Sequence, residues 1–343
     1  MSDIDGQTNV LSLRTGSGSI DGLGRELGRF VVATMPIPWQ LVRDRLGAVP
    51  MAVIHVESME RDVLERQLAE LPECDTILAV GGGQAIDLGK YFAWRRGARL
   101  VTVPTIISVD AFVTPKAAVR LQHRVEYVGH ASPDPLVIDY QLIRSAPPEL
   151  NIAGVGDILS IHTATFDWEL AHRAGHHEHP FSPDDVARAR DLVANVERLA
   201  DEIRRVTDAG LQAIVDGYLR VNTICLPADH YRAEEGSEHY LFYELEERLA
   251  RPFIHGQIVG LGIYILSRLQ QNRVEWITSL LDRIGLRYHP VDLDIDRPTL
   301  AESLRNLRRF VRARNLWHTI IDEREITDAW IDAKLAGLRF ASR

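Results

Sequence analysis

The chain has 343 residues, of which 45% are hydrophobic and 25% are charged, and its formal net charge is −9 at pH 7. This length predicts two domains with substantial hydrophobic cores, and the net negative charge argues against nucleic acid or an anionic membrane as the main partner. The sequence contains no hydrophobic run near the roughly 20 residues of a membrane-spanning helix, and its polar, acidic N-terminus does not resemble a secretory signal.

The N-terminal part of the chain predicts alternating strands and helices. The first 25 or so residues indicate a mobile arm or an edge hairpin. Hydrophobic runs bounded by turn residues then predict buried strands over 29–35, 52–56, 76–80, 100–104 and 136–139. Amphipathic segments predict helices over 39–46, 57–71 and 84–95, and residues 117–130 predict a hairpin. Strand–helix alternation with continuous hydrophobic strands indicates a parallel sheet covered on both faces.

The pattern changes at Ser145-Ala146-Pro147-Pro148, after which nearly every periodic segment indicates a helix. These helices are predicted over 149–174, 183–206, 209–226, 234–249, 255–269, 274–284, 299–308 and 326–335. We therefore place a domain boundary near Ala146, which gives domains of residues 1–146 and 147–343.

Three glycines follow the third predicted strand. Gly81, Gly82 and Gly83 let the backbone approach a phosphate, and the first N–H groups of the helix that follows would face the anion. The run matches neither the GxGxxG nor the Walker pattern, so a tight turn without a ligand is the alternative. Asp87 and Lys90 are three residues apart and can simply pair across one helical turn.

Polar residues also follow the next strand. Ligands of open parallel sheets bind beyond the carboxyl ends of the strands. Thr105 and Ser108 are therefore expected in the same crevice as the glycine turn, unless their hydroxyls serve only the local turn. Asp110 is expected close to the nicotinamide ring, with a local helix cap as the alternative.

Asp157, His239 and His255 predict a metal centre. One carboxylate and two imidazoles can hold a divalent metal and leave a coordination position open, as in catalytic metal sites. The three residues lie on separate segments, which fits a site between facing helices of a bundle. Taken singly, each has a structural interpretation as a helix cap or a buried, hydrogen-bonded histidine. Together with the nucleotide site, the set indicates a metal-assisted dehydrogenase.

Two other features carry weaker signals. Four histidines within residues 172–179 can bind metal, but Gly175 and Pro180 favour a solvated loop. Cys74 and Cys225 match no metal or redox spacing. They favour two buried thiols in a reducing compartment, and we expect a cytoplasmic protein.

The motifs together resemble the glycerol-1-phosphate dehydrogenase branch of the superfamily that also contains iron-containing alcohol dehydrogenases, glycerol dehydrogenase and dehydroquinate synthase. The resemblance runs from about residue 29 to at least residue 269. Its markers are Gly81-Gly82-Gly83-x-x-x-Asp87-x-x-Lys90, Val103-Pro104-Thr105-x-x-Ser108-x-Asp110, Pro115, Gly154-x-Gly156-Asp157, Asp167-Trp168, Gly236-Ser237-Glu238-His239 and His255-Gly256. The Ser-Glu-His and Asp-Trp elements favour this branch.

The resemblance implies a dehydroquinate synthase-like fold, with an α/β Rossmann-like N-terminal domain, an all-α C-terminal domain and a cleft between them. It implies NAD or NADP as cofactor, bound by residues 1–146. It also implies one divalent metal in residues 147–343, with zinc expected and iron or nickel as alternatives. The metal ligands would be Asp157, His239 and His255. The residues that would line the dinucleotide are Gly81, Gly82, Gly83, Gln84, Ala85, Ile86, Asp87, Thr105, Ile106, Ile107, Ser108 and Thr114.

Several positions depart from the family pattern. The family generally has a second histidine one turn after the first histidine ligand, where this chain has Tyr243, and the glutamate usual after His-Gly is Gln257. Lys116 follows Pro115 where the branch tends to be apolar, and Arg120 lies beyond it. These two cations indicate a phosphate or carboxylate on the substrate, unless both are solvated hairpin residues.

We predict a metal-dependent, NAD(P)-linked oxidoreductase that interconverts a small phosphorylated or polyhydroxylated ketone and its secondary alcohol, with Asp110, Lys116 and Tyr243 as catalytic residues. The first alternative is a sugar-phosphate cyclase that uses tightly bound NAD. Lys116 favours it, whereas Ile158-Leu159-Ser160 lacks the lysine that cyclases place there. The second is a ligand-sensing protein that has lost turnover. We expect a small anionic substrate, a homo-oligomer, and neither nucleic acid nor membrane as a partner.

Overall fold

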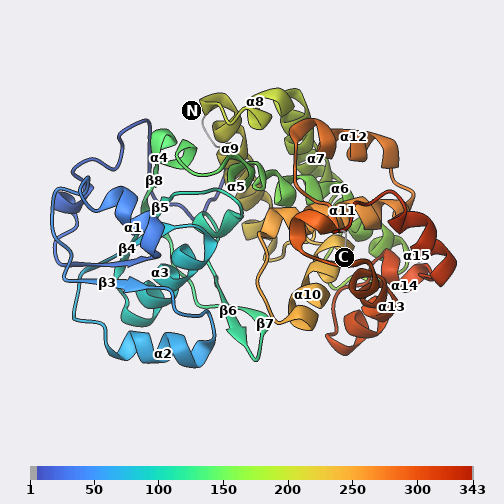
Figure 1. The fold of residues 1–343 in the computed structure, drawn as a ribbon, viewed down its shortest axis with the longest axis horizontal. Coiled ribbons are helices and arrows are strands. Elements are labelled where there is room, and N and C mark those ends of the chain that lie inside the picture. The colour runs from blue at the N-terminus through green and yellow to red at the C-terminus, as the bar shows by residue number, and fades with distance from the viewer. Residues whose placement is uncertain (1–5, 342–343) are drawn as a thin grey trace. The chain divides into compact units, whose positions relative to one another are not determined.

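The computed structural model describes residues 6–341, which divide into two compact units. One unit ends at Asn151 and the other begins at Ile152. Figure 1 labels the helices and strands in chain order. Cofactor binding by residues 1–146 and metal binding by residues 147–343 stay predictions. Residues 1–5, which are part of the expected N-terminal arm, lie outside the described residues.

A six-stranded parallel sheet forms the centre of the first unit. Its strand order is β1–β8–β5–β4–β2–β3, and all neighbouring strands are parallel. The strands are β1 Leu13–Thr15, β2 Phe30–Thr34, β3 Ala52–His55, β4 Thr76–Gly81, β5 Arg99–Pro104 and β8 Pro133–Ile138. The predicted parallel sheet is therefore confirmed.

Both faces of this sheet are packed. On one face, Phe30, Leu78 and Val101 belong to a hydrophobic core cluster. On the other face α3 lies so close that a Cβ at Gly89 would be 2.4 Å from the Cβ of Ala79. Every residue of β2 and β4 is buried. Strands that are covered on both faces need nearly continuous hydrophobic sequence, which explains the hydrophobic runs in these two strands.

Helices and a hairpin complete the first unit. The helical segments are η1 Leu23–Glu26, α1 Pro36–Val42, α2 Arg61–Ala69, α3 Gly83–Arg96, η2 Asp110–Phe112, α4 Tyr140–Arg144 and α5 Pro148–Ile152, which reaches the unit boundary. The predicted hairpin is the antiparallel pair β6 Ala117–Leu121 and β7 Arg124–Val128.

Two predictions for the first unit are wrong in detail. The helix predicted over 39–46 is α1 at Pro36–Val42, so Pro36 and Pro38 lie inside its first turn. Proline fits there because it has the φ of a helix and lacks only an N–H that the first turn leaves unbonded. Residues 13–15 form neither a hairpin nor a free arm. They add β1 to the sheet edge, in parallel beside β8.

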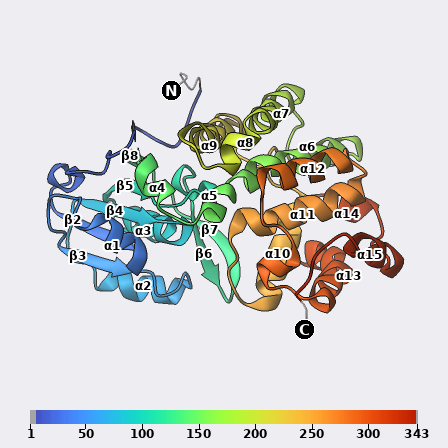
Figure 2. The same cartoon turned by 45° about the horizontal axis from the view of Figure 1, so that its top comes forward.

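The second unit is built of helices in the part that the structure describes, as predicted (Figure 2). They are α6 Val155–Arg173, α7 Pro183–Arg198, α8 Ala200–Arg204, α9 Asp208–Ala228, α10 Ser237–Leu249, α11 His255–Gln270, α12 Val274–Ile284, η3 Pro290–Leu293, α13 Arg297–Ala313, α14 Ile320–Glu323 and α15 Asp328–Leu335. Two helices predicted as continuous are broken: residues 149–174 form α5 and α6, and residues 183–206 form α7 and α8.

Glycines bring α6, α10 and α11 into backbone contact. A Cβ at Gly256 would lie 1.7 Å from the carbonyl oxygen of Ala153, and a Cβ at Gly156 would lie 2.4 Å from the Cα of Gly256. Farther along α11, a Cβ at Gly262 would lie 2.5 Å from the carbonyl oxygen of Glu238 on α10. The break between α5 and α6 falls at this first contact, where the start of α11 meets residues 153–156.

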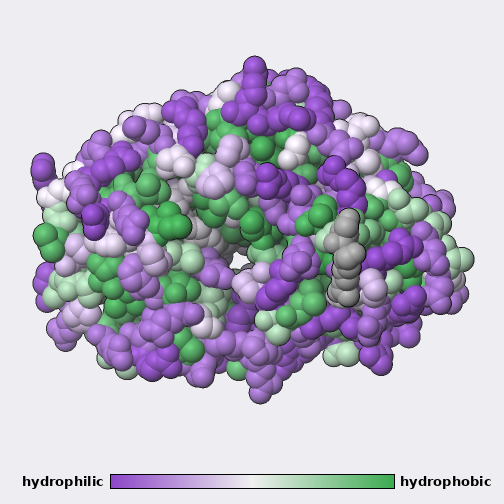
Figure 3. Space-filling model, viewed as in Figure 1, coloured by the Kyte–Doolittle hydropathy of each residue, from purple (hydrophilic) through white to green (hydrophobic). Residues whose placement is uncertain are grey.

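None of the helices within residues 6–341 has both the length and the hydropathy of a membrane-spanning segment. Hydrophilic residues dominate the surface seen in Figure 3, and hydrophobic residues are scattered among them. Val49 and Ile37 of the first unit are among the exposed large hydrophobic side chains, and scattered exposure of this kind is ordinary for protein surfaces.

We expect Gly256→Ala to lower the free energy of unfolding by about 3 kcal/mol or more, because the new methyl group would overlap the carbonyl oxygen of Ala153. Denaturant unfolding measures this loss. Gly175→Ala is the control, since its added Cβ meets no atom within 4 Å and leaves only the strain of a positive φ, about 1–2 kcal/mol. A Gly256→Ala loss no larger than the control would contradict the close helix contact.

Candidate functional site

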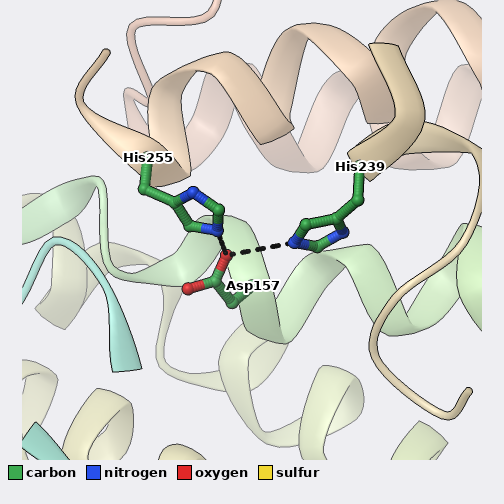
Figure 4. A group of neighbouring side chains, drawn as sticks. All are labelled: Asp157, His239 and His255. Atoms are coloured by element: carbon green, nitrogen blue, oxygen red, sulfur yellow. Dashed lines mark ion pairs between the residues drawn. The ribbon is translucent and has the colours of Figure 1, made fainter. Parts of the chain in front are cut away.

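Asp157, His239 and His255 lie together in the second unit (Figure 4). One ligand atom of each residue lies within 4.8 Å of the others. Asp157 Oδ1 is 3.0 Å from His255 Nε2 and 3.9 Å from His239 Nε2. Among residues 6–341, this is the one group of three or more histidine, cysteine or acidic side chains with such spacing.

Each of the three residues comes from the first turn of its helix. Asp157 is in the first turn of α6, His239 in that of α10, and His255 begins α11. The glycine contacts described above hold the starts of α6 and α11 together, so Asp157 and His255 face each other. A helix N-terminus also stabilises a nearby carboxylate, which favours the ionised form of Asp157.

The cluster is buried and its charges favour a cation. The side chains of Asp157 and His239 are each 3% exposed, whereas His255 is 18% exposed. Burial opposes ionisation of Asp157, but His255 and His239 hold its pKa below the usual value. Burial disfavours a charged imidazole at His239, but the hydrogen bond to Glu238 and the surrounding carboxylates raise its pKa to about 9. Carboxylates that stabilise an imidazolium would stabilise a metal ion in the same place.

The donor set fits a divalent metal. Asp157 Oδ1 is enclosed and makes no hydrogen bond of good geometry in the described structure, although both imidazoles lie near it. The Nε2 atoms of both histidines point toward this oxygen (Figure 4). A carboxylate oxygen with two imidazole nitrogens suits zinc, iron or nickel.

Sequence reasoning missed three neighbours of this cluster. Glu238 Oε1 lies 2.8 Å from His239 Nδ1. Phe242 packs its ring edge-to-face against His255, with centroids 4.8 Å apart. Burial raises the pKa of Glu235 despite the nearby imidazoles of His239 and His255. Glu238 could have been found, because it lies directly before His239 in the Ser-Glu-His motif, but Phe242 and Glu235 carry no comparable signal.

Two of the departures from the family pattern, Tyr243 and Gln257, lie on the same helices as the proposed ligands His239 and His255. Tyr243 follows His239 by one turn of α10, and their ring centroids are 6.3 Å apart. Its side chain is half-buried. Gln257 is in the first turn of α11 and is buried. Tyr243 is therefore close enough to the cluster to shape what binds there.

In the first unit, the glycine turn and the segment after β5 lie side by side. The Thr105 N–H donates to the Gly81 carbonyl oxygen over 3.0 Å. A Cβ at Gly82 would lie 2.7 Å from Ile106 Cδ1, and one at Gly83 would lie 2.7 Å from Val109 Cγ1. A side chain at Gly82 or Gly83 would force Ile106 or Val109 to move, so packing already favours glycine at both positions. This supports the alternative of a tight turn, and use of the turn as a phosphate cradle stays a prediction.

The other residues expected to line the dinucleotide differ in exposure. Gly83, Gln84, Ile106 and Thr114 are half-buried, whereas the others in these segments are buried: Ala85, Ile86, Asp87, Thr105, Ile107 and Ser108. The Ile107 N–H donates to the Asn151 side chain, which fixes this segment within the unit. Contacts from the buried residues to a cofactor would therefore come mainly from the backbone.

Asp87 and Lys90 form a buried ion pair across one turn of α3, with 2.7 Å between Oδ1 and Nζ. Lys90 Nζ also donates to the Lys116 carbonyl oxygen over 2.6 Å. This contact fixes the backbone at the start of the β6–β7 hairpin, while the Lys116 side chain is exposed. Asp110 begins η2, where its carbonyl oxygen accepts from the Val113 N–H.

The histidine-rich tract and the cysteines lie outside the metal cluster. Most of residues 172–179 are exposed at the end of α6 and in the loop after it, and the His176 ring stacks on His318 with centroids 4.0 Å apart. Both cysteines are free thiols, and Cys225 is buried. Cys74 is only half-buried, so the expectation of two buried thiols is wrong for that residue.

Comparison with known proteins points to one superfamily. Residues 39–147 match the family of iron-containing alcohol dehydrogenases. The chain is 27% identical over 329 residues to glycerol-1-phosphate dehydrogenase [NAD(P)+] of Methanothermobacter thermautotrophicus, which covers 91% of this chain and 92% of the relative. It is 30% identical over 228 residues to the Pyrococcus furiosus protein of the same name, covering 66% of this chain and 65% of the relative.

Solved structures show the same fold. A probable glycerol dehydrogenase from Sinorhizobium meliloti aligns with a TM-score of 0.73 and 22% identity, covering 95% of this chain and 96% of that chain. An iron-containing alcohol dehydrogenase from Corynebacterium glutamicum aligns with a TM-score of 0.72 and 15% identity, covering 98% and 96%. The predicted fold, an α/β Rossmann-like domain followed by an all-α domain, is confirmed.

We expect the purified protein, after reconstitution, to hold one divalent metal ion per chain. The double variant His239→Ala/His255→Ala removes two of three ligands and should reduce metal content to background in elemental analysis. The double variant His176→Ala/His177→Ala, in the exposed tract, is the matched control and should keep its metal. Full metal content in the first double variant would show that the ligands have been assigned wrongly.

Proposed function

We propose a specific reaction for this chain, which belongs to the iron-containing alcohol dehydrogenase superfamily, in its glycerol-1-phosphate dehydrogenase-like branch. The chain is a metal-dependent, NAD(P)-linked oxidoreductase. In the proposed reaction, a small phosphorylated or polyhydroxylated ketone and its secondary alcohol are interconverted, in the manner of glycerol-1-phosphate dehydrogenase. The observation that carries this proposal is the buried cluster of Asp157, His239 and His255.

We propose these three residues as the ligands of the metal, with zinc as the expected ion and iron or nickel as alternatives. When bound, a divalent ion would act as a Lewis acid toward the carbonyl oxygen and stabilise the negative charge that develops there. Asp157 contributes a carboxylate, and His239 and His255 contribute ring nitrogens. Burial of Asp157 and His239 keeps water away from the ligand side of the centre.

The first unit is the proposed NAD(P)-binding part. From β2 the strand order proceeds to β3 at one edge of the sheet, and from β4 it proceeds through β5 toward the opposite edge. The order therefore changes direction between β2 and β4. Ligands of such sheets bind beyond the carboxyl ends of the strands at this point. The glycine turn follows β4 there, and α3 begins without a side-chain cap, so its first N–H groups are suited to a pyrophosphate.

Charge favours Lys116 as the contact for an anionic group of the substrate. Carboxylates surround His239 in the metal cluster, since Asp157, Glu235 and Glu238 all act on its imidazole. Carboxylates do not bind a phosphate, so an anionic group of the substrate needs a cation. Lys116 has an exposed side chain on a fixed backbone, and Arg120 follows on β6. Asp110 is the proposed contact for the substrate hydroxyl groups.

Tyr243 is the proposed route for the proton. Its phenol lies one turn from His239, at the position where the family generally has a histidine. A phenol hydroxyl can donate and accept a proton near the reacting oxygen. The alternative role of the Tyr243 side chain is to shape the substrate pocket without transferring a proton.

A sugar-phosphate cyclase is the second candidate, favoured by Lys116 alone. Against it, residues 158 and 159 after the metal carboxylate are buried hydrophobic residues, and Ser160 donates to backbone oxygens. An assay of the reconstituted protein with dihydroxyacetone phosphate, glycerol and sugar phosphates separates the candidates. Net change in NADH absorbance supports a dehydrogenase, turnover without net change supports a cyclase, and no turnover supports a sensor.

A cytoplasmic location and a homo-oligomer belong to the same proposal, and neither a nucleic acid nor a membrane partner is part of it.

We expect Lys116→Met to raise the Michaelis constant for a phosphorylated substrate by about tenfold or more, because a charge-assisted hydrogen bond contributes about 1.5–3 kcal/mol. Cofactor affinity should be nearly unchanged. Steady-state kinetics with phosphorylated and unphosphorylated substrates measure the effect, and Lys334→Met in the second unit is the control. Equal, small effects on both kinds of substrate would make Lys116 an ordinary surface residue.

We expect Tyr243→Phe to lower turnover by about 100-fold or more while metal content stays the same, because general acid–base catalysis typically contributes at least that factor. Unchanged turnover would leave only the role in pocket shape. Tyr243→His restores the residue usual in the family. If it raises activity on dihydroxyacetone phosphate, this position selects the substrate, and if it has no effect on any substrate, the substitution carries no functional meaning.

A further inference from the structure

Glu238 is a fully buried acid directly beside a proposed metal ligand. Its side chain is 0% exposed, and its Oε1 atom lies 2.8 Å from His239 Nδ1. The same oxygen accepts a hydrogen bond from the Gly236 N–H over 2.7 Å. An oxygen that already accepts from a backbone N–H presents a lone pair to the ring, so Nδ1 carries the proton and donates it.

The proton on Nδ1 decides what the other ring nitrogen can do. A neutral imidazole has one N–H, so a proton on Nδ1 leaves a lone pair on Nε2. His239 Nε2 is the atom that faces Asp157 Oδ1. The hydrogen bond from Nδ1 to Glu238 also restrains the rotation of the ring. One contact thus selects both the tautomer and the direction of the free nitrogen.

The position of Glu238 is itself tightly constrained. Its carbonyl oxygen would be only 2.5 Å from a Cβ at Gly262, so α11 packs against its backbone. On the other side, Asp167 is fixed by hydrogen bonds from the Ser237 and Ile320 N–H groups. A Cβ at Gly236 would lie 2.9 Å from Asp167 Oδ2 and 3.1 Å from Glu238 Oε2. Both carboxylates therefore lie close to the Cα atom of Gly236.

Burying two neighbouring carboxylates costs free energy. Burial and the charge of Glu238 raise the pKa of Asp167 to about 6, which is a direct sign of that cost. A neutral residue at position 238 would avoid it. The 2.8 Å contact between Glu238 Oε1 and His239 Nδ1 is the interaction that offsets this cost.

We propose that Glu238 is a positioning residue of the metal centre, which holds His239 in the Nδ1–H form with Nε2 directed at the ion. The proposal rests on the proposed metal site. Carboxylates that accept from a metal-bound histidine orient the ring and raise its basicity. His255 is oriented by a different contact, the edge of the Phe242 ring, so the effect of Glu238 is confined to one ligand.

The experiment compares metal affinity in wild type, E238A, E238Q and the control E246Q, by competition of Zn²⁺ with a chromophoric chelator. Glu246 is also buried on α10, two turns beyond His239. E238A is expected to bind metal about 10- to 100-fold more weakly, the usual cost of removing such a partner. E238Q keeps an acceptor oxygen and should recover most of that loss, and E246Q should bind as wild type does.

The outcomes separate this proposal from the metal site itself. If wild type binds no metal, the proposed centre is wrong. If wild type binds and E238A binds equally well, or if E238Q loses as much as E238A, the positioning role is overturned while the centre stands. Cobalt-substituted protein gives a readout independent of activity, because a reoriented ligand should shift its visible absorption in E238A. Should E238A not fold, ¹⁵N resonances of His239 in the wild-type apoprotein report the tautomer once the pH is above the pKa of about 9 and the ring is neutral, and a neutral ring with its proton on Nε2 would overturn the proposal.

Discussion

The close approach of three helix backbones is the constraint on which the candidate centre depends. Gly156 and Gly256 allow the starts of α6 and α11 to touch, and Gly262 allows α11 to lie against α10 at Glu238. Side chains at these positions would push the helices apart, whereas metal–ligand distances tolerate changes of only about 0.2 Å. The residues next to these contacts are Asp157, Glu238, His239 and His255. Packing and ligand geometry are therefore set by the same few glycines.

Electrostatics in this region is unfavourable for a protein without a cation. Carboxylates of Asp157, Glu235 and Glu238 lie near two imidazoles, and burial removes most of the water that would otherwise screen them. Such an arrangement is costly by itself, and a bound divalent ion would offset much of the cost.

In the first unit, the glycine turn is constrained by packing and leads into a helix without a side-chain cap. Ile106, Val109 and Ala85 each lie where a Cβ on one of the three glycines would have to fit. The turn is thus close-packed on the protein side, while α3 offers uncapped N–H groups. Relatives near 27% identity align with most of this chain. The differences at Tyr243 and Gln257 lie one turn and two residues from ligands, where specificity can change without disturbing the fold.

The sequence by itself determined the local elements and the three residues of the candidate metal centre. Hydrophobic periodicity predicted most strands and helices, since side chains on a packed surface repeat with the period of the element. Motif spacing predicted Asp157, His239 and His255, because coordination requires particular side chains. Only the tertiary structure decided that β1 pairs with β8, that a helix breaks at residues 153–154, that Cys74 is half-buried, and that Glu238 bonds to His239. These features depend on contacts between segments distant in sequence, or on which face of a helix meets its neighbour, and local periodicity contains neither.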